Sequence, residues 1–387
     1  MFGPNLKKIA KWREERNGEA LVKAYQEDNL DIKIAVVQAI GQIQHRAALP
    51  LLLQAMKYRL SPTVRAEAIK SLGVFKESST IKNLIAALGD DAPPVVQAAR
   101  TVLASMGDAA IVPLRDQLND FYHESIRRTC AELLKQSGVR ATNVLIQGLT
   151  EGTYGIREES ARLLGEIGDS KGREALVQAL ADHRIEVRRA AAASLAAVKW
   201  TPGKDIYAAH FYVSQGLVDE AAQLGQVAVP AMFAWIHDED VMLRRKLAIA
   251  LHQLGWKPKT AREAADFWAA AGKFSELVKL GEASTDTLVR LLSDRNLPVK
   301  KGAAKALRRI GVPAHVKSLV RDIELMVETT IFRLKNGTFN LNSIGLQAEH
   351  YKGKYYLLKI DNCDPEQIRH IQQIYPEAEI IDEKDAM

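Results

Sequence analysis

A thirteen-residue pattern that recurs along the chain constrains the fold more than any other feature of the sequence. Its clearest copy is IREESARLLGEIG, residues 156–168. Apolar and small residues occupy one side of this copy at helical spacing: Ile156, Ser160, Ala161, Leu164 and Ile167. The small residues lie in the middle, where another helix must come close, and glycines stand at 165 and 168. The pattern therefore predicts a short helix that packs closely against other helices.

Copies of the pattern define a repeat. Its leading aliphatic position is held by Ile32, Val64, Val95, Ile126, Ile156, Val187, Leu243 and Val299. The residue eight positions further on is Ile40, Leu72, Leu103, Leu134, Leu164, Leu195, Leu251 and Leu307. Neighbours in this second series are 32, 31, 31, 30, 31, 56 and 56 residues apart. A period of about 31 residues accommodates two short helices and two tight turns, the length of a two-helix solenoid repeat.

The residue after the leading aliphatic position is basic in nearly every copy: Lys33, Arg65, Val96, Arg127, Arg157, Arg188, Arg244 and Lys300. With VRRAAAASL from Val187 and LRRKLAIALHQLG from Leu243, this pattern resembles HEAT-like repeats, particularly the short kind of bacterial and archaeal proteins and of phycobilin lyases. The resemblance covers roughly residues 18–320. It implies an all-α, right-handed α-solenoid in which an acid and the arginine tie one repeat to the next. It says little about function, because such repeats serve many roles.

Four parts are expected along the chain. Residues 1–17 read as an N-terminal cap helix, residues 18–198 as six repeats of about 31 residues, and residues 199–328 as two extended 56-residue repeats with a sealing helix. Residues 329–387 read as a small α+β domain.

The expected elements of this last domain follow from its turn and strand residues. They are hairpins turning at Asn336-Gly337 and near Lys352-Gly353, a helix starting at Asp364-Pro365, and a final strand in EAEII.

The longer period arises from a duplicated segment of 25 extra residues. KWTPGKDIYAAHFYVSQGLVDEAAQLG and GWKPKTAREAADFWAAAGKFSELVKLG align at an offset of 56, with Trp200 matching Trp256 and Gly216 matching Gly272. We interpret each segment as a helix pair turned at its glycine. The shared aromatic residues are explained by packing at a helix junction, with a ligand cage or base-stacking platform as the alternative.

Composition and motifs favour a non-catalytic protein. The 387 residues are 47% hydrophobic and 26% charged, with two cysteines and no signal peptide or membrane span, which predicts a cytoplasmic protein. His123-Glu124 is a single pair without counterparts in other repeats, so it is expected to be solvated rather than to bind a metal. Cys130 takes a small-residue core position and is expected to be buried. We therefore expect no catalytic residue, no metal and no cofactor.

Charge is unevenly distributed. Residues 187–321 hold 21 Lys and Arg against 12 Asp and Glu, a net of +9, whereas residues 322–387 hold 7 against 12, a net of −5. On the second helices of the last three repeats, positions two, six and nine after the leading aliphatic residue share one outward face. With Lys246, the basic residues at these positions predict a binding strip on the concave side: Arg189, Arg245, Lys246, Lys301, Lys305 and Arg308.

These observations predict a scaffold or adaptor that binds a protein partner on the concave face. Nucleic-acid binding through the basic strip is one alternative, a solvated face without a ligand is another, and a bilin-lyase-like enzyme on a HEAT-like scaffold is a third. The acidic tail, including Asp382, Glu383 and Asp385, provides an internal competitor that would cover the strip. The identity of the partner is not encoded in any motif.

Overall fold

The computed structural model describes residues 4–120, 122–325, 329–335, 349–351, 355–361, 365–376 and 379–381. The chain divides into two compact units, Met1–Gln215 and Gly216–Met387.

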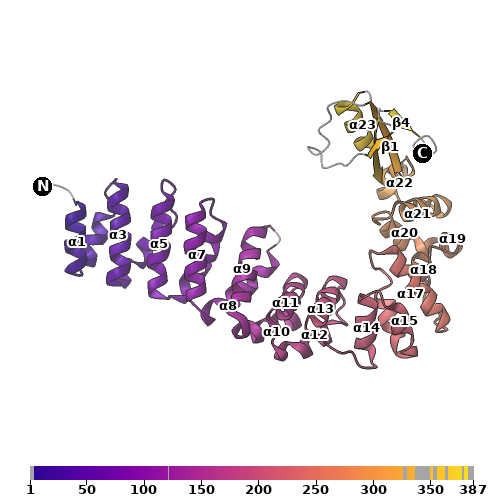
Figure 1. Ribbon diagram of the computed structural model, residues 1–387, viewed down its shortest axis with the longest axis horizontal. Coiled ribbons are helices and arrows are strands. Elements are labelled where there is room, and N and C mark those ends of the chain that lie inside the picture. Colours follow the sequence, from indigo (N-terminus) through magenta and orange to yellow (C-terminus); the bar gives the residue numbers. More distant parts are fainter. Residues whose placement is uncertain are drawn as a thin grey trace. The chain divides into compact units, whose positions relative to one another are not determined.

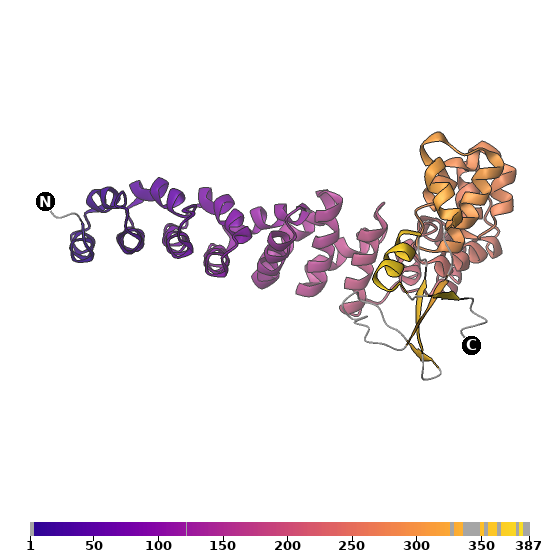
Figure 2. The ribbon, with the colours of Figure 1, turned by 90° about the horizontal axis from the view of Figure 1, so that it is seen from above.

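The first unit is a stack of helix pairs in two rows (Figures 1 and 2). One row holds the first helices: α2 (Gly18–Ala24), α4 (Leu49–Ala55), α6 (Ile81–Ala86), α8 (Asp108–Asp116), α10 (Thr142–Glu151), α12 (Arg173–Ala179) and α14 (Ile206–Ser214). The other holds α1 (Leu6–Glu14) and the second helices: α3 (Leu30–Ile43), α5 (Pro62–Phe75), α7 (Pro93–Ser105), α9 (Glu124–Ser137), α11 (Tyr154–Ile167) and α13 (Ile185–Ala197). Successive second helices contact one another, which confirms the predicted α-solenoid.

The repeated pattern forms the core of the stack. Every residue of the series eight positions after the leading aliphatic one is at most 1% exposed, from Ile40 to Leu307. Gly165 allows α11 and α13 to approach, because an ideal Cβ there would lie 2.3 Å from the Cβ of Ser194. The Ser194 hydroxyl donates across the same contact to the carbonyl of Ala161, at 2.9 Å. The glycine of the pattern is therefore required by helix packing between repeats.

Arginines tie neighbouring repeats, as the resemblance implied. Arg65 donates to both carboxylate oxygens of Asp90, at 2.8 and 2.7 Å, and Arg157 meets Asp182 at 2.8 and 3.1 Å. Each of these acids lies 25 residues further on, in the turn of the following repeat. In these two copies the paired hydrogen bonds fix the orientation of one repeat against the next.

The second unit continues with helix pairs. Its helices are α15 (Val218–Ala222), α16 (Val229–Ala234), α17 (Val241–Gln253), α18 (Ala261–Ala270), α19 (Phe274–Leu280), α20 (Thr285–Leu291), α21 (Leu297–Ile310) and α22 (Lys317–Leu325). Gly216 and Gly272 have φ of +74° and +69°, so both predicted glycine turns of the duplicated segment adopt the left-handed conformation.

The aromatic residues of the duplicated segments pack on one another. The ring centroids of Trp200 and Phe211 are 5.3 Å apart, and those of Trp256 and Phe267 are 5.2 Å apart. Trp256 also stacks on Phe233 at 5.0 Å. These contacts support the packing interpretation of the Trp-x-Pro motif over a ligand cage.

A small sheet with one helix follows α22. The strands β1 (Thr329–Lys335), β2 (Glu349–Tyr351), β3 (Tyr355–Asp361) and β4 (Glu379–Ile381) are antiparallel and ordered β2-β3-β1-β4, with α23 at Pro365–Ile374. The predicted α+β character is confirmed. The expected turns at Asn336-Gly337 and Lys352-Gly353, the cap Asp364 and the acidic tail lie outside the described residues. The four-part division of the chain stays a prediction.

Candidate functional site

The predicted basic strip is divided between the two units. Arg189 lies half-buried on α13 of the first unit, whereas the other five residues lie on α17 and α21 of the second. The strip as one continuous surface therefore stays a prediction. Within the second unit, Arg245, Lys246 and Lys305 are exposed, and Lys301 is half-buried.

In the second unit, α19 and the turn that precedes it lie between α17 and α21. Gly272, just before α19, lies beside the guanidinium of Arg245 on α17. The ring of Phe274, the first residue of α19, occupies the space next to Gly302 on α21. The duplicated segment thus adds a complete helix pair to the stack, rather than a loop outside it.

We call the exposed side of α17, α19 and α21 the second-helix face. Its cations are Arg245, Lys246, Lys273, Lys279, Lys301, Lys305 and Arg308. Two of them meet carboxylates, since Lys279 lies 2.8 Å from Glu276 and Arg308 lies 2.9 Å from Glu324. The predicted strip did not include Lys273 and Lys279, although the alignment at offset 56 already indicated a helix pair in this segment.

Apolar side chains are exposed among these cations. Met242 and Ile249 on α17 are 56% and 59% exposed and flank Arg245 and Lys246 in the helix. Leu247, by contrast, points into the core and is fully buried. The face therefore combines positive charge with apolar contact area.

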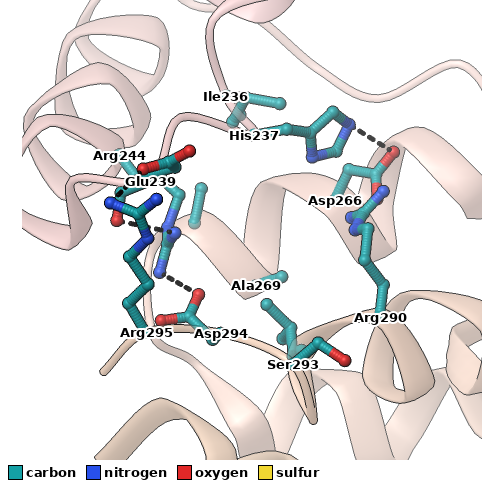
Figure 3. A pocket seen from close by; sticks show the side chains of 12 residues that line it. Ile236, His237, Glu239, Arg244, Asp266, Ala269, Arg290, Ser293, Asp294 and Arg295 are labelled. Atoms are coloured by element: carbon teal, nitrogen blue, oxygen red, sulfur yellow. Dashed lines mark hydrogen bonds and ion pairs between the residues drawn. The ribbon is translucent and has the colours of Figure 1, made fainter. Parts of the chain in front are cut away.

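A pocket of about 280 Å³ lies at another place in the second unit, between the turn after α16, the helix α18 and the turn after α20 (Figure 3). Its floor is apolar, with the buried residues Ile236, Ala269, Ala270 and Leu291. Charged side chains surround the floor: His237, Glu239, Arg244, Asp266, Arg290, Asp294 and Arg295.

Asp266 organises one side of the pocket. Its carboxylate accepts from Arg290 at 2.7 Å and from the Thr287 hydroxyl at 3.0 Å, and lies 3.3 Å from Nε2 of His237. Burial of the carboxyl raises its pKa, but the hydrogen bonds and charges of His237 and Arg290 outweigh this effect and lower the pKa to about 2. Asp266 is therefore ionised at neutral pH.

Arg244 organises the opposite side (Figure 3). Its guanidinium donates to the carbonyl of Asp238 at 2.7 Å and pairs with Asp294 at 2.7 Å. Nearby, Arg295 pairs with Glu239 at 2.6 Å. Arg244 is 6% exposed, and its Nε has no hydrogen-bond partner within the described chain.

The sequence argument did not single out this pocket. Asp266 aligns with His210 at the offset of 56, next to the matched phenylalanines 267 and 211. His210 is also buried, and burial, with a smaller contribution from the charge of Arg188, lowers its pKa to about 4. A titratable residue at the same position of both duplicated helices was a signal available in the sequence.

The residues considered for chemistry in the first unit have structural partners. His123 is exposed and its Nδ1 lies 2.8 Å from Asp120, while Glu124 pairs with Arg128 at 2.7 Å. Cys130 is fully buried, as predicted, and burial raises its pKa to about 12. In the described part of the chain, no group of three His, Cys, Asp or Glu side chains is placed to hold a metal ion.

The repeats match a known family. The family model described as HEAT repeats matches residues 18–104, 49–135 and 142–209. This chain is a HEAT-like repeat protein. The two rows of helices, the buried repeat positions and the Arg-Asp pairs lie in the matched repeats. Helix pairs with the same buried positions are also present in the second unit.

Two curated proteins are similar to part of this HEAT-like repeat protein. The phycocyanobilin lyase subunit beta of Thermosynechococcus vestitus is 28% identical over 149 residues, which are 38% of this chain and 55% of that protein. The phycocyanobilin lyase subunit beta of Nostoc sp. is 27% identical over 141 residues, 36% of this chain and 55% of that protein. The chain thus spans about half the length of these relatives.

These matches correct one prediction. The expectation that the chain is not an enzyme is wrong, because both curated relatives are lyase subunits and point to enzymatic activity. Neither relative is named as a nucleic-acid-binding protein, so the nucleic-acid alternative gains no support.

Solved structures are similar at low TM-scores. Human deoxyhypusine hydroxylase with glycerol has a TM-score of 0.24 and 19% identity, covering 64% of this chain and 89% of that one. The complex of CpcE and CpcF of phycocyanin lyase from Nostoc sp. PCC7120 has a TM-score of 0.27 and 19% identity, covering 65% and 94%. Among the described residues, every helix is too short or too polar to cross a bilayer.

Proposed function

We propose that this HEAT-like repeat protein binds an acidic protein partner on its second-helix face. The observation that carries the proposal is the mixture on α17, where exposed Met242 and Ile249 flank Arg245 and Lys246. A polyanion needs only the cations, whereas a protein partner gains affinity from burial of apolar anchors beside them. The cations then favour acidic partners and accelerate encounter.

Charge reversal tests the proposal. A variant carrying Arg245→Glu, Lys246→Glu and Lys305→Glu reverses exposed residues only, which preserves the buried core. The control carries Lys7→Glu, Lys82→Glu and Lys171→Glu, exposed positions of the first unit with the same change in charge. Both are used as bait in lysate of the source organism, beside wild type. The proposal expects a protein retained by wild type and the control, and lost from the first variant.

Further variants separate protein from nucleic acid. Ile249→Ser keeps every cation and removes the apolar anchor, so it should weaken a protein partner but leave a polyanion bound. If the retained ligand is duplex DNA, log affinity falls with log salt at a slope of about −0.9 per phosphate neutralised. That salt dependence contradicts the proposal. So does a partner that the triple charge-reversal variant retains as well as wild type does.

A second candidate function is lyase chemistry of the phycocyanobilin kind, favoured by the two curated relatives. In this case the second-helix face holds the protein on which the lyase acts. Titration of free phycocyanobilin into the purified chain, followed by absorption spectroscopy, tests it directly. A saturable change in the phycocyanobilin spectrum supports this candidate. An unchanged spectrum at equimolar protein and phycocyanobilin contradicts it.

A further inference from the structure

The pocket of the second unit carries more hydrogen-bond donors than acceptors. Each of its three carboxylates already forms an ion pair with an arginine. The pairs are Asp266 with Arg290, Asp294 with Arg244, and Glu239 with Arg295. An arginine offers five N–H donors. Within the described chain, Arg290 bonds only through Nη2 to Asp266, and Arg295 pairs only with Glu239, so both retain donors.

A buried donor without a partner lies in the same place. Arg244 lines the pocket, is 6% exposed, and leaves its Nε–H unbonded within the described chain. Within the described residues the Nε of Arg127 also has no hydrogen-bond partner, so an unbonded donor alone does not mark a site. Arg127 also lines a cavity, but its side chain is 28% exposed, whereas that of Arg244 is 7% exposed. A buried donor left without an acceptor costs about 1 to 3 kcal/mol, which an acceptor inside the pocket recovers.

The cations form two groups on opposite sides of the floor. Figure 3 shows Arg244 and Arg295 on one side, His237 and Arg290 on the other, and Ala269 between them. The side chains of Arg290 and Arg295 are 44% and 79% exposed, so both are accessible from solvent. The floor of Ile236, Ala269 and Leu291 provides apolar contact for a short carbon chain.

From this arrangement we infer that the pocket binds a small aliphatic dicarboxylate, with one carboxylate at each cationic group and the methylene chain on the apolar floor. A guanidinium fork matches the geometry of a carboxylate. The volume of about 280 Å³ is at the lower end for ligand pockets, which fits a molecule with few heavy atoms. The inference is independent of the proposed protein partner, because the pocket uses none of the cations of the second-helix face.

Calorimetric titration of the full chain tests the inference. The probes are succinate, glutarate and adipate, with glutaramide as the neutral analogue and inorganic phosphate as the compact anion. Arg290→Gln and Arg295→Gln each remove one cation from an accessible head, and Arg262→Gln is the control, an exposed arginine of α18 outside the pocket lining.

We expect one dicarboxylate to bind saturably at one site per chain and to be preferred over the other lengths. Each pocket variant should weaken binding about tenfold or more, because a charge-assisted pair is lost, while the control should bind as wild type does. Absence of saturable binding for all three acids overturns the inference. Equal binding of glutaramide or phosphate, or unchanged affinity in both pocket variants, also overturns it.

Discussion

Gly165→Ala tests the packing that underlies the repeat pattern. A Cβ at residue 165 would lie 2.3 Å from the Cβ and Oγ of Ser194 and 2.8 Å from its Cα. Carbon atoms in contact prefer about 3.5–4.0 Å, so α11 and α13 must separate by about 1 Å. That movement also weakens the hydrogen bond from Ser194 to the carbonyl of Ala161.

The magnitude follows from three contributions. Overpacking of this kind costs about 1–3 kcal/mol, and the strained hydrogen bond costs about 1 kcal/mol. Alanine is favoured over glycine inside a helix by about 1 kcal/mol, which offsets part of the loss. We therefore expect the free energy of unfolding of the first unit to fall by about 1–3 kcal/mol.

Urea unfolding followed by circular dichroism measures this change. Gly203→Ala is the matched control, because the nearest atom to its Cβ, Oδ2 of Asp205, lies at an ordinary 3.5 Å. In the Gly165→Ala background, Ser194→Gly removes two of the three clashing atoms and should restore part of the stability. A Gly165→Ala protein as stable as wild type would refute the close approach of α11 and α13.

Three further predictions concern the first unit. Cys130→Ser should lower the free energy of unfolding by about 1–3 kcal/mol, because the site is fully buried and the Ser160 hydroxyl at the equivalent repeat position has no hydrogen-bond partner within the described residues. Cys130→Ala should cost less in the same urea assay. Asp182→Asn should destabilise the unit more than Asp28→Asn in thermal denaturation, because Asp182 pairs with Arg157 at 2.8 Å and Asp28 is exposed. The pKa of about 4 for folded His210 lies below its ordinary 6.5, so stability is greatest above pH 6.5 and falls as the pH drops towards 4. The loss is at most about 3 kcal/mol. Thermal melts across this pH range should show a smaller fall in stability for His210→Gln than for wild type.

Much of the fold was predictable because the repeat places one kind of residue at one kind of position. The buried series from Ile40 to Leu307 and the left-handed glycines 216 and 272 followed from spacing alone. Local periodicity determines which side of a helix is buried, and tight turns need glycine. These features depend on neighbours within one or two repeats.

The candidate sites were harder to predict because they depend on which helices become neighbours. The basic strip was predicted from residues of the second helices alone, and it did not include the helix that begins at Phe274 and lies between α17 and α21. The pocket joins His237, Asp266 and Arg290, which are 29 and 24 residues apart in the sequence and have no shared motif. Such juxtapositions depend on how successive helix pairs stack, which the spacing of residues within one repeat does not determine.

Site-specific photocrosslinking at Ile249 tests the central claim most directly. A photoreactive amino acid replaces Ile249, which is 59% exposed at the middle of α17, and in a second protein it replaces Val139, which is 69% exposed in the first unit. After irradiation in the source organism, we predict a discrete protein adduct from position 249 that disappears when Arg245, Lys246 and Lys305 are reversed to glutamate. An adduct from position 139 alone, or an adduct from position 249 that survives the charge reversal, would contradict binding on the second-helix face.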